Sequence, residues 1–568
     1  MSRRLDARVL ILPGAALLIA YLTIVPLGML IYGSLRSGAV GDPEATYTLA
    51  NYARAYLDPA LYRLFLNSIV YAAGTCLVAF LIGAYLAWVT ERTNTPLRGL
   101  IAVVALVPFI IPGILNTISW LLLLSPRIGL INLLVKNALG LSAGPFNVYT
   151  LGGMIWVEAT HLYPLVFLLM SAAFRSMDMS LEEASIIAGS RTFTTLRRVT
   201  LPLMSPAIIS TLLIMFVRAI ESFEVPALIG IPARVPVFTS RIFLAIHQFP
   251  SDFGLAGSYA ITLLLLSAMG VVIYHRITRQ GERFATITGR GYQPRVIDLG
   301  RLRYVACGGA LLVFVITVGL PVFVLLWVSV TPYYGVPSWE LFQRVTLDAY
   351  RYVLNSPMAL AAFKNSFSLA AGSATAVMLL TSVIAWITVK SKIPGRALLD
   401  NLAFIPIAFP GIVLGVSLIW VSLTLMPLLY GTFWILGIAY ITRFMPYGIR
   451  AASASMIQIH DELEEAALAC GSSWRQAFQR IILPLLMPGF VAGWIYVSIV
   501  SLRELSTSIL LYSPQSIVLS ILAFDMWEGG QYNYVAALGV LMVLLLVLMA
   551  VVARGLGAKI GLRSDIGR

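Results

Sequence analysis

The chain has 568 residues, of which 59% are hydrophobic and 11% are charged, and its formal net charge is +14. Soluble globular proteins contain about 25% charged residues, so this composition excludes an ordinary water-soluble domain. The basic residues lie in short segments between apolar runs, as the positive-inside rule predicts for cytoplasmic loops, and this distribution argues against a nucleic-acid partner.

Twelve apolar runs follow one another along the chain, and each is long enough to cross a hydrocarbon core of about 30 Å as a helix. They lack the alternation of membrane β-strands, and a backbone in lipid must satisfy its own hydrogen bonds. We therefore expect an all-α polytopic membrane protein with about 12 transmembrane helices. The expected spans are 9–35, 64–90, 99–124, 148–174, 203–230, 256–275, 304–331, 362–389, 398–427, 433–456, 485–512 and 533–553.

The charges of the connecting segments predict the orientation of these spans. Segment 276–303 contains seven arginines and only two acidic residues, and the C-terminal tail is also basic. Both are expected on the cytoplasmic side. An even number of spans then places the N-terminus on that side too, in agreement with its arginines. The first apolar run is too long for the hydrophobic region of a signal peptide, so we expect it to be a membrane helix.

Short motifs recur between the two halves of the chain in the same order. The clearest matches are Asn67-Ser68 with Asn365-Ser366, Pro112-Gly113 with Pro410-Gly411, and Leu201-Pro202 with Leu483-Pro484. The first two matches share an offset of 298 residues, and the third has an offset of 282. The repetition predicts two parallel six-helix repeats, residues 1–275 and 304–568, joined by a basic cytoplasmic tether over 276–303. A solute path is expected where such repeats meet.

An amphipathic segment lies between the fourth and fifth spans of each half, at about 175–202 and 457–484. In both segments an acidic pair precedes two small residues, a glycine and a Leu-Pro pair. The acidic pair favours a helix N-terminus, the glycine a left-handed helix end, and the proline the first turn of the next helix. The small residues leave room for another protein surface. These residues are Glu182, Glu183, Ala184, Ser185, Gly189, Leu201 and Pro202, and in the second half Glu464, Glu465, Ala466, Ala467, Gly471, Leu483 and Pro484.

Both segments resemble the EAA motif of permeases of binding-protein-dependent ABC importers. The second copy matches fully, and the first has Ser185 where the second alanine is usual. The resemblance implies a fused two-half permease with the type I ABC importer permease fold, in the bacterial inner (plasma) membrane. It implies that each segment is a coupling helix for one of two copies of an ATP-binding subunit, and that a periplasmic or lipid-tethered solute-binding protein docks outside.

The resemblance also implies that the chain is not itself an enzyme and binds no cofactor, since ATP and Mg would bind to the partner subunits. The sequence contains no GxxxxGK[ST] phosphate-binding loop. Membrane lipid is the remaining expected partner. An ion-coupled secondary transporter is the alternative from another class, but it would need no docking segments for an ATPase.

Three further segments are similar to those of ferric-iron-type permeases, namely 284–292 in the tether, 221–226 in the fifth span and 503–511 in the eleventh. This similarity implies ferric iron as the solute. Permeases of the same class serve thiamine, phosphonate, sugar phosphate or polyamine, and these solutes stay open as alternatives.

Seven charged residues within the spans are candidates for the translocation path, because ionisable groups inside a membrane are costly and usually functional. They are Glu158, Arg218, Glu221, Glu224, Arg443, Arg503 and Glu504. The 282 offset relates Glu221 to Arg503, so we expect these two to approach each other between the halves. The alternative is that the charges form structural ion pairs. The four histidines lack the spacing of metal ligands, so no metal site is expected.

Overall fold

The computed structural model describes residues 7–38, 40–177, 180–281, 296–390, 395–473, 476 and 478–559. Within these residues nine helices are long and apolar enough to cross a membrane, or up to 11 if each of two bent pairs is one span. The nine lie in α1 (Ala7–Ser34), α3 (Ala60–Arg92), α7 (Leu151–Ser176), α10 (Leu201–Glu221), α12 (Phe253–Gly281), α13 (Leu302–Phe314) with α14 (Leu320–Val330), α17 (Pro357–Ala385), α23 (Leu483–Leu502) and α26 (Tyr532–Lys559).

Every one of the twelve predicted spans coincides with helical structure. The tenth corresponds to α20 (Phe433–Ile457), which has 25 residues and is long enough to cross a bilayer. It carries Arg443 and Arg450 and is not among the nine most apolar helices. The chain is thus a multi-pass membrane protein, as its composition predicts.

The third predicted span of each half is not one straight helix. In the first half α4 (Arg98–Val104) and the 3₁₀ turn η1 (Val107–Phe109) bend by 97° into α5 (Gly113–Leu124). In the second half α18 (Arg396–Phe404) and η7 (Ile405–Ala408) bend by 108° into α19 (Gly411–Leu425). The prediction of continuous spans at 99–124 and 398–427 is wrong in this respect. Pro112 and Pro410 stand at the bends with extended ψ angles, and a proline cannot continue the hydrogen-bond ladder of a preceding helix.

The fifth predicted span of each half also stops inside its expected range. Helix α10 ends at Glu221, and the π-helical turn η3 (Pro226–Gly230) follows after a break. Helix α23 ends at Leu502, and α24 (Ser508–Leu511) follows in the same way. The predicted continuous spans at 203–230 and 485–512 are therefore interrupted, and the charged residues of these spans lie at or beside the interruptions.

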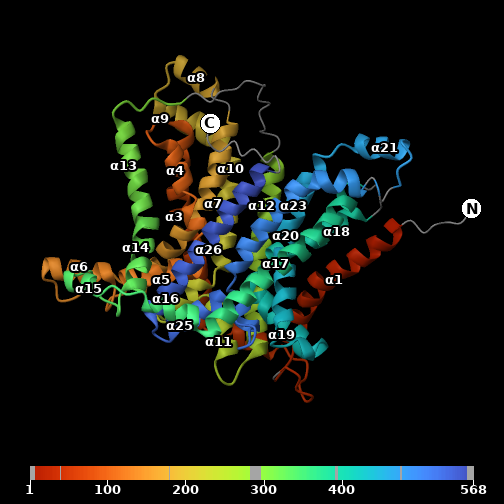
Figure 1. Ribbon diagram of the computed structural model, residues 1–568, viewed down its shortest axis with the longest axis horizontal. Coiled ribbons are helices and arrows are strands. Elements are labelled where there is room, and N and C mark those ends of the chain that lie inside the picture. Colours follow the sequence, from red (N-terminus) through yellow and green to blue (C-terminus); the bar gives the residue numbers. More distant parts are fainter. Residues whose placement is uncertain are drawn as a thin grey trace, which may run out of the picture.

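The two halves exchange their first helices (Figure 1). Helix α1 packs on α19 of the second half, where a Cβ at Gly33 would collide with the Trp420 ring. In return α13 packs on α3 of the first half, where the Tyr85 hydroxyl donates to the Ala306 carbonyl at 2.8 Å. Residues 1–275 and 304–568 are separate in sequence but interlocked in space.

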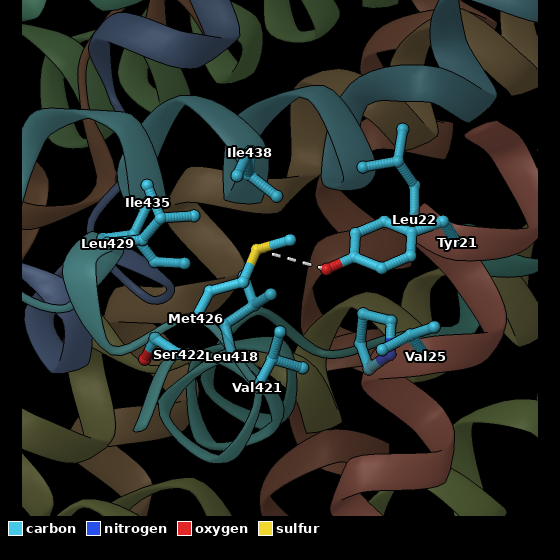
Figure 2. Close-up of a pocket in the computed structure, with 11 residues that line it drawn as sticks. Tyr21, Leu22, Val25, Leu418, Val421, Ser422, Met426, Leu429, Ile435 and Ile438 are labelled. Carbon is cyan, nitrogen blue, oxygen red and sulfur yellow. Dashed lines mark hydrogen bonds between the residues drawn. The ribbon is translucent and has the colours of Figure 1, made fainter. Parts of the chain in front are cut away.

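A small apolar pocket between α1 and the α19–α20 region belongs to this packing (Figure 2). The Tyr21 hydroxyl donates to the Met426 sulfur there at 3.3 Å. The cavity volume is about 10 Å³, which is at the lower limit for a single water molecule. The residues around this pocket are therefore closely packed, and the pocket offers no room for a solute.

Equivalent hydrogen bonds explain why Asn-Ser recurs in the two halves. The Phe238 amide donates to Ser68 Oγ at 3.1 Å, and the Leu519 amide donates to Ser366 Oγ at 2.8 Å. These amides begin α11 (Phe238–His247) and α25 (Leu519–Glu528). A buried amide at a helix start needs an acceptor. Each serine therefore holds the start of α11 or α25 against the second predicted span of its own half.

Both segments that resemble the EAA motif lie toward one end of the molecule. Figure 1 shows α8 (Ser180–Ile187) and α21 (Asp461–Ala469) at that end, with α11, α16 (Asp348–Asn355) and α25 at the opposite end. This placement agrees with the predicted parallel arrangement of the two halves.

Candidate functional site

The first candidate site consists of the two segments that contain α8 and α21. Gly189 follows α8 with a φ of +84°, and Gly471 follows α21 with a φ of +85°. A Cβ at either glycine would meet nothing within 4 Å. The left-handed backbone, and not a lack of space, therefore calls for glycine at both positions. The predicted left-handed helix ends are confirmed.

The chain then re-enters the bundle through a similar path in both halves. In the first half α9 (Thr192–Thr195) and the π-helical turn η2 (Leu196–Thr200) lead into α10, and in the second half η9 (Phe478–Ile482) leads into α23. Leu201 and Leu483 are the first residues of these helices, and Pro202 and Pro484 lie in their first turns. The Leu201 amide donates to the Leu196 carbonyl of η2, so α10 continues a helix that has already formed, and in both halves the proline, which lacks an amide hydrogen, follows a π-helical turn.

Glu182 has a structural partner that the sequence did not reveal. Its carboxylate accepts a hydrogen bond from Arg92 Nη2 at 2.5 Å and another from Thr200 Oγ1 at 2.5 Å. The Arg92 side chain is only 2% exposed. Glu182 thus joins α8 to the end of α3 and to the residue before α10. A buried arginine at the end of an apolar span was the signal for this contact, because such a charge needs a partner.

The exposed surface of α8 is largely apolar. Ile186 is 54% exposed and Ile187 is 86% exposed, and Ala184 is exposed beside them. Glu183 and Ser185 are half-buried, and the Ser185 hydroxyl lies 3.0 Å from Thr195 Oγ1. These side chains form an uncovered apolar surface on a short helix.

The corresponding surface of α21 is also open. Glu465 and Ala466 are exposed, Ala467 is half-buried and Leu463 is 43% exposed. The side chain of Glu464 lies outside the described residues. Both segments therefore expose small or apolar residues, among them Ala184 and Ala466, while Ser185 and Ala467 are half-buried.

The second candidate site is a buried polar cluster at the helix interruptions. Arg443 Nε and Glu504 Oε2 are 3.0 Å apart, and the two side chains are 17% and 6% exposed. The Thr507 amide donates to Glu504 Oε1 at 2.9 Å, and Arg443 Nη1 donates to Thr507 Oγ1 at 3.2 Å. Both members of this ion pair belong to the second half.

Glu158 is bound within the first half. Its Oε2 accepts from the Ser222 hydroxyl at 2.8 Å and from the Tyr71 hydroxyl at 3.2 Å. The 282 offset places Tyr440 at the equivalent position, where its hydroxyl lies 2.8 Å from Ser508 Oγ. The first half therefore carries an acid where the second half carries a phenol.

Two arginines reach from one half into the other. Arg218 of α10 donates to the Tyr447 hydroxyl of α20, and its guanidinium lies 5.7 Å from the centre of that ring. Arg503, directly after α23, donates to the Phe109 carbonyl of η1 and lies 5.2 Å from the Phe109 ring centre. Both contacts would have to change if the halves moved relative to each other.

The predicted approach of Glu221 to Arg503 does not give an ion pair in the described part of the chain. The reason is that α23 ends at Leu502, so the Arg503 side chain leaves the helical direction and turns toward Phe109. Glu221 is the last residue of α10, and its buried Oε1 has no hydrogen-bond partner. The cluster thus contains one unsatisfied carboxylate oxygen.

The first residues of α5 and α19 border this cluster. A Cβ at Gly411 would lie 2.6 Å from Arg443 Cζ and 2.8 Å from Ser506 Cβ. A Cβ at Gly113 would lie 3.4 Å from His161 Nε2 and 3.6 Å from Glu224 Cδ. Gly411 is therefore required by close packing, whereas Gly113 has room for a methyl group.

The polar cluster does not have the composition of a metal cage. Among the residues with described positions, no group of three or more His, Cys, Asp or Glu side chains could hold a metal ion. The cluster contains arginine side chains beside the glutamates instead. Segment 284–292, one of the three segments similar to those of ferric-iron-type permeases, lies outside the described residues.

Comparison with known families gives two matches in this chain. The family described as binding-protein-dependent transport system inner membrane component matches residues 79–280 and again residues 378–561. The two matched stretches correspond to the two halves of the internal repeat.

Individual relatives resemble either the whole chain or one half of it. The Fe(3+)-transport system permease protein FbpB 2 of Haemophilus influenzae is 22% identical over 518 residues, which cover 90% of this chain and 92% of the relative. The ferric transport system permease protein FbpB of Actinobacillus pleuropneumoniae is 25% identical over 411 residues, covering 71% of this chain and 58% of the relative. The spermidine/putrescine transport system permease protein PotC of Escherichia coli is 26% identical over 217 residues, covering 38% of this chain and 80% of the relative.

Proposed function

This chain belongs to the family of binding-protein-dependent transport system inner membrane components, and we propose that it imports ferric iron. It is the permease of an ABC importer, and permeases of this family are not enzymes themselves. The proposal for iron rests on the two ferric-transport relatives, one of which aligns with 90% of the chain. The resemblance to a spermidine/putrescine permease supports a polyamine as the second candidate solute.

The observation that carries the transport mechanism is the pair of EAA-like segments at one end of the molecule. We propose that α8 and α21 each dock on one copy of an ATP-binding subunit, which binds ATP and Mg. The outward Ile186 and Ile187 of α8 supply apolar contact area. This end would face the cytoplasm with both termini, and the opposite end would receive a periplasmic or lipid-tethered binding protein.

Glu182 would transmit the movement of the ATP-binding subunit. Because Glu182 is bound to Arg92 at the end of α3 and to Thr200 before α10, displacement of α8 would pull both helices together. Rotation of the halves would then break the contacts of Arg218 and Arg503 across the interface. In this mechanism the two arginine contacts hold the resting arrangement.

The path for the cation would run beside the buried carboxylates. Glu504 is neutralised by Arg443 and Glu158 is held by two hydroxyl donors, so Glu221 and Glu224 are the carboxylates best suited to attract a passing cation. A weak path is sufficient, since the external binding protein would hold the iron tightly. The iron is cargo in this mechanism and not a resident cofactor.

Uptake of radiolabelled ferric iron by iron-starved cells, with and without the gene, tests the proposed solute. Loss of ATP-dependent uptake on deletion, restored by the gene, is expected. Unchanged uptake would reject iron, and spermidine, thiamine and phosphorylated solutes would then be tested in the same cells.

A further inference from the structure

A second, separate cavity lies between α8 and the ends of α3, α7 and α10. Its volume is about 740 Å³, within the range of ligand-binding pockets. Five polar side chains line it: Arg92, Glu182 and Thr200, which meet at one end, and also Glu183 and Thr195. The remaining wall is mostly apolar and includes Phe80, Ala84, Trp88, Met170, Phe174 and Ile208. This combination suits an amphipathic ligand with one polar end.

Arg92 points to the chemistry of that polar end. One of its guanidinium nitrogens, Nη2, binds Glu182 at 2.5 Å, but the buried Nη1 has no hydrogen-bond partner. The residue is 2% exposed, so bulk water does not satisfy Nη1. An unsatisfied buried donor is unfavourable. A phosphate oxygen is a strong acceptor for a guanidinium, so a phosphate group at this end would remove the penalty.

The length and position of the cavity indicate a lipid. Phe80 and Arg92 line it from the same helix, and twelve helical steps of 1.5 Å give a length of about 18 Å. One leaflet of a bilayer has a hydrocarbon depth of about 15 Å, half of the core. Since α3, α7 and α10 are membrane-spanning, the Arg92 end lies toward the headgroups and the Phe80 end toward the acyl chains.

We propose that this cavity binds one phospholipid of the leaflet next to the coupling segments, with its phosphate group at the Arg92 end and an acyl chain along α3. The cytoplasmic assignment of that leaflet rests on the proposed function. Burial of acyl methylenes is favourable and free phosphate has none, so the apolar wall favours a lipid over free phosphate. The bound lipid would fill the space behind α8 and support the first coupling segment.

Variants in the apolar wall test this site without touching Arg92. Ala84→Trp fills the cavity, and Leu81→Trp places the same side chain on the same helix at a position that is 60% exposed. Native mass spectrometry of the detergent-purified chain would count retained phospholipids. Ala84→Trp is expected to retain one phospholipid fewer than the wild type, and Leu81→Trp the same number.

A second variant and a second ligand keep the test decisive. If Ala84→Trp does not elute as a folded species, Ile208→Trp fills the same cavity from α10 and replaces it. Delipidated wild-type protein is expected to gain thermal stability from added phosphatidylethanolamine and none from inorganic phosphate. Equal lipid retention in the wild type and the cavity-filling variant, or equal stabilisation by phosphate alone, would overturn the proposal. Neither readout involves transport, so failure of the proposed iron import would leave this result unaffected.

Discussion

The contact between Glu182 and Arg92 gives the sharpest prediction for the first coupling segment. Glu182→Ala removes a carboxylate whose side chain is 11% exposed and leaves the 2%-exposed Arg92 without its ion-pair partner. Removing one member of a buried ion pair costs about 3–5 kcal/mol. The hydrogen bond from Thr200 is lost as well. The packing of α8 against the end of α3 and the start of α10 should therefore lose about 4 kcal/mol of stability.

The matched control is Glu340→Ala. Glu340 pairs with Arg344 at 2.8 Å, but these side chains are 71% and 57% exposed. An exposed pair contributes about 0–1 kcal/mol. The two variants make the same substitution in an ion pair and differ in burial.

Hydrogen exchange of the α8 amides measures the effect directly. A loss of about 4 kcal/mol corresponds to about a thousand-fold faster exchange, since each 1.4 kcal/mol is a factor of ten. Glu182→Ala should accelerate exchange of residues 180–187 by that factor or abolish their protection, whereas Glu340→Ala should leave it unchanged. Less than ten-fold acceleration in Glu182→Ala would refute the account of how this segment is held.

Three further perturbations test the bundle by thermal denaturation. Gly411→Ala should lower the denaturation midpoint, because its Cβ would lie 2.6 Å from Arg443 Cζ. Gly113→Ala should leave the midpoint unchanged, because its Cβ would lie 3.4 Å from the nearest atom. Equal midpoints in the two variants would contradict the packing argument. Tyr447→Phe removes an acceptor between the halves and should cost about 1–3 kcal/mol; an unchanged midpoint would show that the contact does not stabilise the resting state. Burial and the nearby Glu528 raise the pKa of Asp525 from 3.8 to about 6, so its stabilising effect is present below about pH 4 and is lost as the pH rises to about 6. Asp525→Asn should therefore lose less stability than the wild type between about pH 4 and pH 7, and an identical loss would reject this assignment.

The repeat and the coupling segments were predictable because they depend on local backbone requirements. Gly189 and Gly471 need left-handed φ angles, and Ser68 and Ser366 accept from amides at helix starts. Such requirements fix the residue type at a position whatever packs around it. Motifs of this kind therefore recur in register, and the register reveals the two halves.

The bends and the exchange of first helices were not predictable from hydropathy. Both arms of each bent pair are apolar, so an apolar run continues through the bend although Pro112 or Pro410 interrupts the helix. Lipid is as apolar as a neighbouring helix, so composition carries no information about which helix covers which. The packing of α1 on α19 therefore required the three-dimensional structure.

The partners of the buried charges were predicted least well. The offset correctly relates Glu221 to Arg503, but a long side chain selects its partner by direction as well as by position. Helix α23 ends one residue before Arg503, and this end turns the side chain toward Phe109. The Arg443–Glu504 pair and the anchoring of Glu182 by Arg92 likewise depend on side-chain geometry that spacing does not encode.

Reconstituted transport tests the central claim most directly. Proteoliposomes containing this permease, its ATP-binding subunit and its external binding protein would be supplied with radiolabelled ferric iron, with and without internal ATP. We expect ATP-dependent iron accumulation that disappears in the double variant Glu183→Lys with Glu465→Lys. The Glu340→Lys variant, at the exposed surface pair, should accumulate iron like the wild type. Iron accumulation without ATP, or undiminished accumulation in the double variant, would contradict ATP-driven import coupled through these two segments.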